Sequence, residues 1–379
     1  MEGRRAALRI LHTNMLRGWG GQSNRILTEA RGAIRAGHQV AFAVPHIAVL
    51  GERGREAGVE ILPHYEMRPP AQFWTFIPDV LRMARDIERW KPDLIHMHGS
   101  PDTWVTVLAK RLVKGKFPPL IRTRHNMVEW NHSFLNKWLY PQIDSYVTIS
   151  RYTEKQFHDY PGLTGKPMVL INSVPDVAKF SEAAESIRSE WTEIPPGAFV
   201  WGTSARMRWE KAHDILIRAF ALLAAEGRPC FLILAGDGSE KGKLEELAQS
   251  LKLGPDRIKF LGFRKDVPRV LASVDAYALA SRSEALGTSI LEALAMGLPV
   301  VASNVGGIPD SVRHEDSGLL FESENPASMA AAMRRIMDDA ALRARLSEGA
   351  RRVVAEVFDE ERLVRKTLEF YRLVSGLPS

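Results

Sequence analysis

The 379-residue sequence predicts an α/β protein made of two doubly wound, Rossmann-like domains. Short apolar runs of strand length alternate with amphipathic helical stretches, which is typical of parallel sheets with crossover helices. This alternation is interrupted once, near residues 172–197, and then restarts. The length also favours two domains, because single hydrophobic cores rarely grow beyond roughly 250–300 residues.

In the first half of the chain, five apolar runs have the length and composition of buried strands, and the stretches between them have helical spacing. The expected strands are Leu8–His12, Gln39–Val44, Leu94–His98, Leu120–Thr123 and Ser145–Ile149. The clearest helical stretches are Ser23–Ala36 and Ile77–Trp90. This half therefore predicts one complete parallel sheet with its covering helices.

The second half repeats the pattern after a charged segment that Pro175, Pro195 and Pro196 interrupt. Its expected strands are Phe199–Thr203, Phe231–Ala235, Ile258–Leu261, Ala276–Leu279 and Pro299–Ala302. We therefore predict an N-terminal domain at residues 1–172 and a C-terminal domain at residues 173–358. The remaining residues, 359–379, include a final helical pattern that we expect to pack back on the N-terminal domain.

Composition excludes several classes of protein. Hydrophobic residues make up 45% and charged residues 25%, which are ordinary globular values rather than those of a disordered or disulfide-built chain. A single cysteine, Cys230, can form neither an internal disulfide nor a multi-thiolate zinc site. No signal-peptide pattern and no run of 18 apolar residues is visible, so we expect a cytoplasmic protein whose membrane contact, if any, is peripheral.

The positive charge is concentrated in the first half. Residues 1–172 hold 24 Lys and Arg against 15 Asp and Glu, a balance of +9, whereas residues 173–379 carry −3. Such asymmetry favours an anionic partner, namely a membrane surface, an acidic glycan or a nucleic acid. The segment Val107–Phe117, with Lys110, Arg111, Lys114 and Lys116, is a candidate lipid-facing surface. A solvated basic surface explains the same pattern.

The most informative stretch runs from Ser281 to Asp310. Gly287 precedes Thr288 and Ser289, two residues that cap helices well, and a glycine-led helix start offers free N–H groups to a phosphate. Glu284 lies before this helix and Glu292 lies on it, so both carboxylates are candidates to face one ligand. Two unrelated surface charges are the alternative.

This stretch closely resembles the signature of the retaining family-4 glycosyltransferases of the GT-B fold. Glu284 and Glu292 have the family's separation, and Glu-Ala-Leu-Ala-Met-Gly-Leu-Pro-Val-Val-Ala-Ser and Gly306-Gly307 follow. The resemblance implies two Rossmann-like domains facing each other across a cleft. It also implies sugar transfer from a nucleotide diphosphate sugar, UDP- or GDP-linked, to an acceptor hydroxyl with retention, without a cofactor or an essential metal.

The resemblance assigns roles to residues of the second half. The segment from Gly202 to Ile217 is similar to the family segment whose arginine and lysine hold the donor diphosphate, which here are Arg206 and Lys211. Glu292 is expected at the ribose and Glu284 at the donor sugar, with Gly287 and Thr288 at the phosphates. Ala212 departs from the family, which usually has glycine there, and Ser173 replaces the usual glycine of the hinge. Gly236 and Gly238 lie in another similar segment.

In the first half, Gly18-Trp-Gly-Gly-Gln-Ser-Asn-Arg resembles the family's glycine loop at the donor phosphates, with Gly20 and Gly21 permitting close backbone approach. A simple strand-to-helix turn is the alternative. His125 matches the position where similar enzymes place a histidine beside the transferred sugar. Ser150 and His98 are further candidates for the cleft, with packing favoured for His98. No His, Asp or Glu cluster has metal-ligand spacing, so we expect no metal site.

Together these features predict a glycosyltransferase of lipopolysaccharide or surface-polysaccharide assembly, acting on a glycan or lipid-linked acceptor and not on nucleic acid. Six of the nine tryptophans lie in the first half and suit sugar rings or a membrane interface: Trp19, Trp74, Trp90, Trp104, Trp130 and Trp138. A nucleotide-sugar 2-epimerase of the same fold is the main alternative. A non-catalytic sugar-binding protein is a second one, and a dehydrogenase is disfavoured because GxGxxG is missing after a strand.

Overall fold

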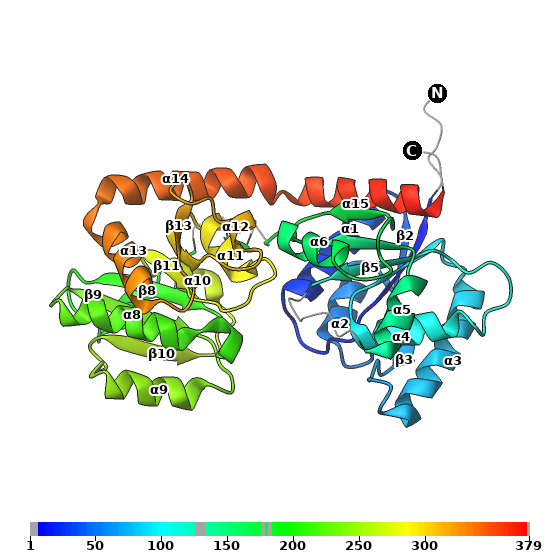
Figure 1. The fold of residues 1–379 in the computed structure, drawn as a ribbon, viewed down its shortest axis with the longest axis horizontal. Coiled ribbons are helices and arrows are strands. Elements are labelled where there is room, and N and C mark those ends of the chain that lie inside the picture. Colours follow the sequence, from blue (N-terminus) through cyan, green and yellow to red (C-terminus); the bar gives the residue numbers. More distant parts are fainter. Residues whose placement is uncertain (1–6, 126–132, 176–178, 181–183, 377–379) are drawn as a thin grey trace. The chain divides into compact units, whose positions relative to one another are not determined.

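The computed structural model describes residues 7–125, 133–175, 179–180 and 184–376 (Figure 1). The chain forms two compact α/β units, residues 1–173 with 360–379 and residues 174–359. Trp130 lies outside the described residues. No helix within the described ranges is both long enough and apolar enough to cross a membrane.

The first unit is built on a seven-stranded parallel sheet with the strand order β3-β2-β1-β4-β5-β6-β7. Its strands are β1 (Arg9–Thr13), β2 (Gln39–Pro45), β3 (Glu60–Tyr65), β4 (Leu94–Met97), β5 (Leu120–Arg124), β6 (Ser145–Thr148) and β7 (Met168–Leu170). Its helices are α1 (Gly21–Arg35), α2 (Val49–Glu56), α3 (Phe73–Trp90), α4 (Ser100–Ala109), α5 (Phe134–Leu139), α6 (Arg151–His158) and α15 (Glu360–Ser375).

The strand order of this sheet reverses beside β1. Ile10 pairs with Val40 of β2 on one side and with Leu94 of β4 on the other. The loops that follow β1 and β4 therefore run in opposite directions from the carboxyl ends of these two strands. Open α/β sheets bind ligands in the crevice that such a divergence leaves. The central strands are buried because helices cover both faces of a parallel sheet.

The second unit contains a six-stranded parallel sheet with the order β10-β9-β8-β11-β12-β13, which reverses between β8 and β11. Its strands are β8 (Phe199–Ser204), β9 (Cys230–Ala235), β10 (Ile258–Gly262), β11 (Ala276–Leu279), β12 (Val300–Ser303) and β13 (Gly318–Phe321). Its helices are α8 (His213–Ala225), α9 (Lys241–Ser250), α10 (Val267–Leu271), α11 (Thr288–Ala295), α12 (Ile308–Ser311), α13 (Pro326–Asp338) and α14 (Ala340–Val357).

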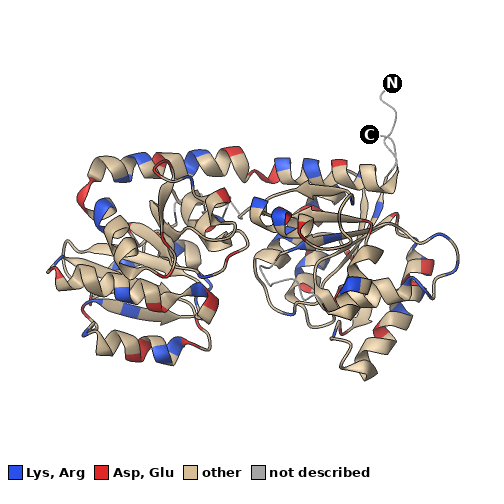
Figure 2. Cartoon of the chain, in the orientation of Figure 1, with Lys and Arg blue, Asp and Glu red and all other residues tan. Residues whose placement is uncertain are grey.

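Helix α15 follows the second unit in sequence but belongs to the first. It packs on α1, where its buried side chains are Leu363, Thr367, Leu368, Phe370 and Tyr371. A Cβ on Gly32 of α1 would lie 2.3 Å from a methyl carbon of Val364, so a glycine permits this close approach. Basic and acidic residues are interspersed along α14 and α15, as expected for helices with one solvated face (Figure 2).

All ten strands expected from the sequence are present, and each of their bounds differs by at most one residue from the expected one. The strands β3, β7 and β13 were not expected. All three lie at sheet edges, and β3 includes charged and exposed positions, so an apolar run does not reveal it.

Candidate functional site

Lys211 and Glu284 meet at the carboxyl edge of the second unit's sheet. Lys211 ends the 3-10 turn Trp209–Lys211 after β8, and Glu284 lies in the loop between β11 and α11. The Lys211 ammonium forms an ion pair with Glu284 Oε2, and the two side chains are only 18% and 13% exposed. The structure thus brings together the cation and the carboxylate that the sequence motifs indicated separately.

Arg282 joins the two loops that carry this pair. Its guanidinium donates to both carboxylate oxygens of Asp214, at 3.0 and 2.8 Å, and to the carbonyl of Trp209 at 2.9 Å. Such a bidentate contact fixes geometry as well as charge. No sequence motif indicates Arg282, because its partners lie 68 and 73 positions away in the chain.

The helix start next to this pair differs from the expected one. Gly287, not Thr288 or Ser289, is the N-cap of α11, and it has a left-handed backbone with φ 83°. The expectation of two side-chain caps was therefore wrong, and the first N–H groups of the helix have no partner within it. This end carries the positive pole of the helix. Glu292 is half-buried on the same helix, one turn further along.

Arg206 is exposed in the loop after β8, and two glycines support that loop. A Cβ on Gly236 would lie 2.0 Å from the carbonyl oxygen of Ala205, and one on Gly238 would lie 2.3 Å from that of Met207. Both glycines are therefore required by backbone packing within the protein. They hold the loop that presents Arg206 to solvent.

Ala212 has a left-handed backbone, with φ 49° and ψ 41°, and is the N-cap of α8. Glycine adopts this conformation without the steric cost that a Cβ brings. This backbone conformation explains why glycine suits the position, and in this chain alanine adopts it.

In the first unit, the glycine loop leads from β1 into α1. Gly20 is the extended N-cap of α1, and Gly21 is the first residue of that helix. A Cβ on Gly20 would meet nothing within 4 Å, so the protein's own packing does not require glycine there. Gln22 ties the loop to the sheet, because its amide donates to Asn14 Oδ1 at 2.8 Å and to the His98 carbonyl at 3.0 Å.

His125 ends a chain of three hydrogen-bonded histidines. His12 Nδ1 lies 3.0 Å from His98 Nε2, and His98 Nδ1 lies 3.0 Å from His125 Nε2. Burial lowers the pKa of His12 to about 3 and holds the pKa values of His98 and His125 well below 6.5. All three rings are therefore neutral at pH 7, and His98 acts as the link between the other two.

A second polar group lies beside this chain. Suitable ligand atoms of His12, Glu29, His96 and His98 lie within 4.8 Å of one another, a grouping that could hold a metal ion. Spacing along the chain did not reveal it, because β1, α1 and the end of β4 contribute its members. Hydrogen bonds engage both ring nitrogens of His96, with Tyr371 at 2.6 Å and Thr123 at 2.7 Å. Two other ligand atoms of the group, Glu29 Oε2 and His12 Nε2, are buried without a hydrogen-bond partner among the described residues.

Two other residues have structural roles. Ser150 is buried and caps α6, where its hydroxyl accepts from the Thr153 N–H at 3.2 Å. Ser173, the departure from the usual hinge sequence, lies 3.2 Å from Arg25 Nη1, which also donates to the Ile171 carbonyl at 2.6 Å. Arg25 in turn forms a buried ion pair with Glu29 at 2.8 Å.

The two parallel sheets, matched in succession by two glycosyltransferase family models, place the chain in the GT-B class of glycosyltransferases. Two family models match the chain in succession, "Glycosyltransferase Family 4" at residues 19–177 and "Glycosyl transferases group 1" at residues 188–353. The chain belongs to the family-4 glycosyltransferases. It is a glycosyltransferase enzyme, and the epimerase alternative is not favoured.

Curated relatives are identical to this chain at about a quarter of the aligned positions. A D-inositol 3-phosphate glycosyltransferase of Salinispora arenicola is 28% identical, covering 80% of this chain and 73% of its own. The lipopolysaccharide core biosynthesis glycosyltransferase LpsD of Rhizobium meliloti is 27% identical, covering 87% and 93%.

Solved structures match nearly the whole chain. A glycosyltransferase from Rickettsia africae aligns with a TM-score of 0.83 at 21% identity, covering 97% of this chain and 98% of its own. Anabaena HepE in complex with UDP-glucose aligns with a TM-score of 0.79 at 20% identity, covering 96% and 99%. At this identity the likeness shows the fold alone.

Proposed function

We propose that the protein transfers a sugar, with retention at the anomeric carbon, from a UDP- or GDP-linked donor to a hydroxyl of a glycan or lipid-linked acceptor. The pathway we propose is lipopolysaccharide or surface-polysaccharide assembly. The observation that carries the donor side is the Lys211–Glu284 ion pair beside the N-terminus of α11. The solved structure of HepE with UDP-glucose and the curated relative LpsD support the donor class and the pathway.

On the donor side, each residue has a distinct task. Lys211 and Arg206 stabilise the negative charge that grows on the departing diphosphate, and the first N–H groups of α11 add to this field. Glu292 accepts hydrogen bonds from the ribose hydroxyls. Glu284 accepts a hydrogen bond from a hydroxyl of the donor sugar. Until the donor binds, Lys211 holds the Glu284 carboxylate in place. Gly20 and Gly21 allow a phosphate to approach the backbone.

His125 contacts the transferred sugar as a neutral imidazole. Because its pKa is far below 7, it acts as a hydrogen-bond partner and not as a cation. In the front-face route that we propose, the acceptor oxygen bonds to the anomeric carbon as the bond to the diphosphate breaks. A phosphate oxygen takes the acceptor proton. We expect this step to proceed in the presence of EDTA, because the developing charge is met by protein cations.

Thermal shift is the first test of the donor site. The purified protein is screened against UDP, GDP, ADP, CMP and NAD, since a ligand that binds only the folded state raises the melting temperature. We expect a shift with UDP or GDP that is lost in Lys211→Ala and Glu292→Ala and kept in Lys243→Ala, a change at a 75% exposed lysine of α9. A shift with NAD alone would overturn the proposal.

Turnover completes this test. Lys211→Ala removes a transition-state contact, so we expect kcat/KM to fall by about 10²- to 10³-fold. NMR of the anomeric proton in the product reports retention or inversion. Release of a free rearranged sugar without any acceptor would instead indicate an epimerase.

A peripheral membrane position is the remaining part of the proposal. Helix α3 exposes Phe73, Trp74, Ile77 and Leu81, which follow one another at helical spacing. Helix α4 packs against α3, and the segment that directly follows α4 carries Lys110, Arg111, Lys114 and Lys116. An apolar helix face with nearby basic residues suits an anionic bilayer at the cytoplasmic side.

Vesicle sedimentation tests this surface. We expect binding to vesicles that contain phosphatidylglycerol, weaker binding to phosphatidylcholine vesicles, and loss of binding when the four basic residues are changed to Glu. Trp74→Ser with Ile77→Ser should also weaken binding. If the wild type stays in the supernatant with both kinds of vesicle, the membrane part is wrong.

A further inference from the structure

A cavity of about 520 Å³ lies within the first unit, at the carboxyl end of its sheet. Its walls come from the loop after β1, the loop between β3 and α3, the start of α4, the end of β5, and α5 with the turn that follows it. This volume falls in the range of pockets that hold small molecules, roughly 300–1,000 Å³.

Positive charge dominates this cavity. Arg122 and Arg124 both line it, and they lie two positions apart on β5, which places them on the same face of the sheet. The described residues that line it include no Asp or Glu. Asp102 influences Arg122 electrostatically but is not part of the lining, and its Oδ2 accepts from Thr13 and from the His98 and Gly99 N–H groups.

One guanidinium nitrogen of Arg122 has no hydrogen-bond partner among the described residues. The Arg122 guanidinium lies over the ring of Tyr140, 4.9 Å from its centroid, and the nitrogen concerned, Nη1, is buried. Burial and the charge of Arg122 lower the pKa of Arg124 to about 10. Buried donors are rarely left unpaired, so an unpaired guanidinium nitrogen at a pocket indicates a ligand oxygen.

The rest of the pocket suits a ring-shaped polar molecule. The N-terminus of the ten-residue helix α4 contributes Gly99 and Ser100 and adds the positive pole of a helix. Asn136 and His125 offer hydrogen bonds. Trp104 and Tyr140 provide aromatic walls, and such faces pack well against sugar rings.

We propose that this pocket binds the acceptor, and that the acceptor is a sugar or cyclitol carrying an anionic group, a phosphate or a carboxylate, held by Arg122 and Arg124. The inference rests on the proposed glycosyl transfer and adds the acceptor's class. His125 lines the same pocket, which places the acceptor next to the histidine assigned to the transferred sugar. Guanidinium groups bind both kinds of anion through paired hydrogen bonds, so the pocket chemistry is shared by the two.

Binding to the full-length protein tests the class of acceptor. Inorganic phosphate, glucose 6-phosphate, glucuronate and glucose are titrated by thermal shift and calorimetry. We expect the anions to bind and neutral glucose to bind at least about tenfold more weakly, since charge-assisted bonds are roughly twice as strong as neutral ones. Preference for glucose 6-phosphate or for glucuronate then distinguishes a phosphorylated from a carboxylated acceptor.

Variants locate the binding. Arg122→Gln should weaken anion binding about tenfold or more while leaving the weak binding of glucose unchanged. Arg31→Gln, at an exposed position of α1, is the matched control and should change neither. If Arg122→Gln lowers the melting temperature of the free protein, its weaker binding could reflect a loss of stability. The binding of the anions and of glucose is then compared in Arg124→Gln.

The outcomes separate this inference from the proposed function. Equal binding of glucose and the anions, no binding of any anion, or unchanged anion affinity in both arginine variants would overturn it. The UDP or GDP shift, measured on the same samples, reports the donor site in the second unit. Its absence would count against the glycosyltransferase proposal, whereas its presence without anion selectivity would reject only the anionic acceptor.

Discussion

The hydrogen bonds that link His12, His98 and His125 determine which ring nitrogen of His125 carries the proton. His12 Nε2 is buried without a partner among the described residues, and His12 Nδ1 faces His98. An unpaired buried N–H donor is costlier and rarer than an unpaired acceptor, so the His12 proton belongs on Nδ1. His12 then donates to His98 Nε2, and His98 donates through Nδ1 to His125 Nε2. The His125 proton therefore lies on Nδ1.

Nitrogen-15 NMR of the histidine rings at pH 7 checks this tautomer. We expect His125 to show a protonated Nδ1 and a bare Nε2. We also expect His125→Asn, whose amide nitrogen lies near the Nδ1 position, to retain more activity than His125→Gln. A protonated Nε2 on His125 would reverse the donor order and contradict the assignment.

His213 makes the second unit sensitive to acid. Only 3% of this residue is exposed, and neither ring nitrogen has a hydrogen-bond partner among the described residues. Burial and the charge of Lys211 lower its pKa from 6.5 to about 4. Between these two values the unfolded state binds a proton that the folded state does not, so stability falls as the pH drops below 6.5.

Replacing His213 by Leu removes both the unpaired ring nitrogens and this proton linkage. We expect His213→Leu to be at least as stable as the wild type at pH 7.5, because an apolar group of similar size replaces unsatisfied polar atoms. Between pH 7.5 and 5.5, the wild type should lose about 1.4 kcal/mol more than the variant. Urea unfolding at the two pH values measures the difference. Equal losses would show that His213 is protonated in the folded state.

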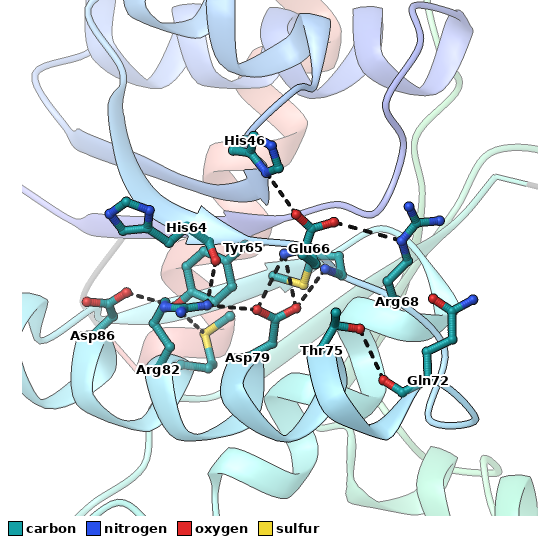
Figure 3. A network of polar contacts seen from close by, with 12 residues as sticks. His46, His64, Tyr65, Glu66, Arg68, Gln72, Thr75, Asp79, Arg82 and Asp86 are labelled. Carbon is teal, nitrogen blue, oxygen red and sulfur yellow. Dashed lines mark hydrogen bonds and ion pairs between the residues drawn. The ribbon is translucent and has the colours of Figure 1, made fainter.

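The loop between β3 and α3 is held by a buried carboxylate (Figure 3). Asp79 of α3 accepts from the N–H groups of Glu66 and Met67, at 3.1 and 2.7 Å, and pairs with Arg82 at 3.0 Å. Met67 has a positive φ of 50°, an unusual backbone for a non-glycine residue. Asp79 therefore fixes a strained loop that continues into Pro69 and Pro70 of the pocket wall.

We expect Asp79→Ala to lower the free energy of unfolding by about 1–3 kcal/mol, because it leaves two backbone donors unpaired. Anion binding in the pocket should weaken with it. Arg85→Ala, an exposed change on the same helix, should alter neither quantity. Urea unfolding and calorimetry provide both readouts. An unchanged stability in Asp79→Ala would show that water replaces the carboxylate.

The sequence predicted the central strands correctly, and its motifs indicate donor residues whose roles stay a prediction. A strand buried on both faces reads as an apolar run, and a motif that binds phosphate needs its glycine and its charges close together in sequence. The edge strand β3 escaped prediction because charged and exposed positions interrupt its apolar run. The contacts of Arg282 and His12 escaped prediction for another reason. Their partners are distant in sequence and become neighbours only through the strand order, so no local pattern reveals them.

The first unit is completed by the last helix of the chain. Helix α15 places five buried side chains on this unit, and Tyr371 reaches His96 at 2.6 Å. Full burial of a large apolar side chain contributes about 1.5–3 kcal/mol. The loss of several such side chains approaches the whole stability of a domain, about 5–15 kcal/mol. The last helix is therefore part of the first unit's core.

A chain that ends at Asp359 should consequently lose the fold of its first unit and keep that of the second. Hydrogen exchange with mass spectrometry resolves the two, and we expect fast exchange in residues 7–173 and unchanged protection in β8–β13. Gly32→Ala is a milder test, because its methyl group would overlap Val364 and overpacking costs about 1–3 kcal/mol. Gly18→Ala, where a Cβ would meet nothing within 4 Å, is the matched control. Equal protection of the first unit in the full-length and shortened chains would show that α15 is dispensable to it.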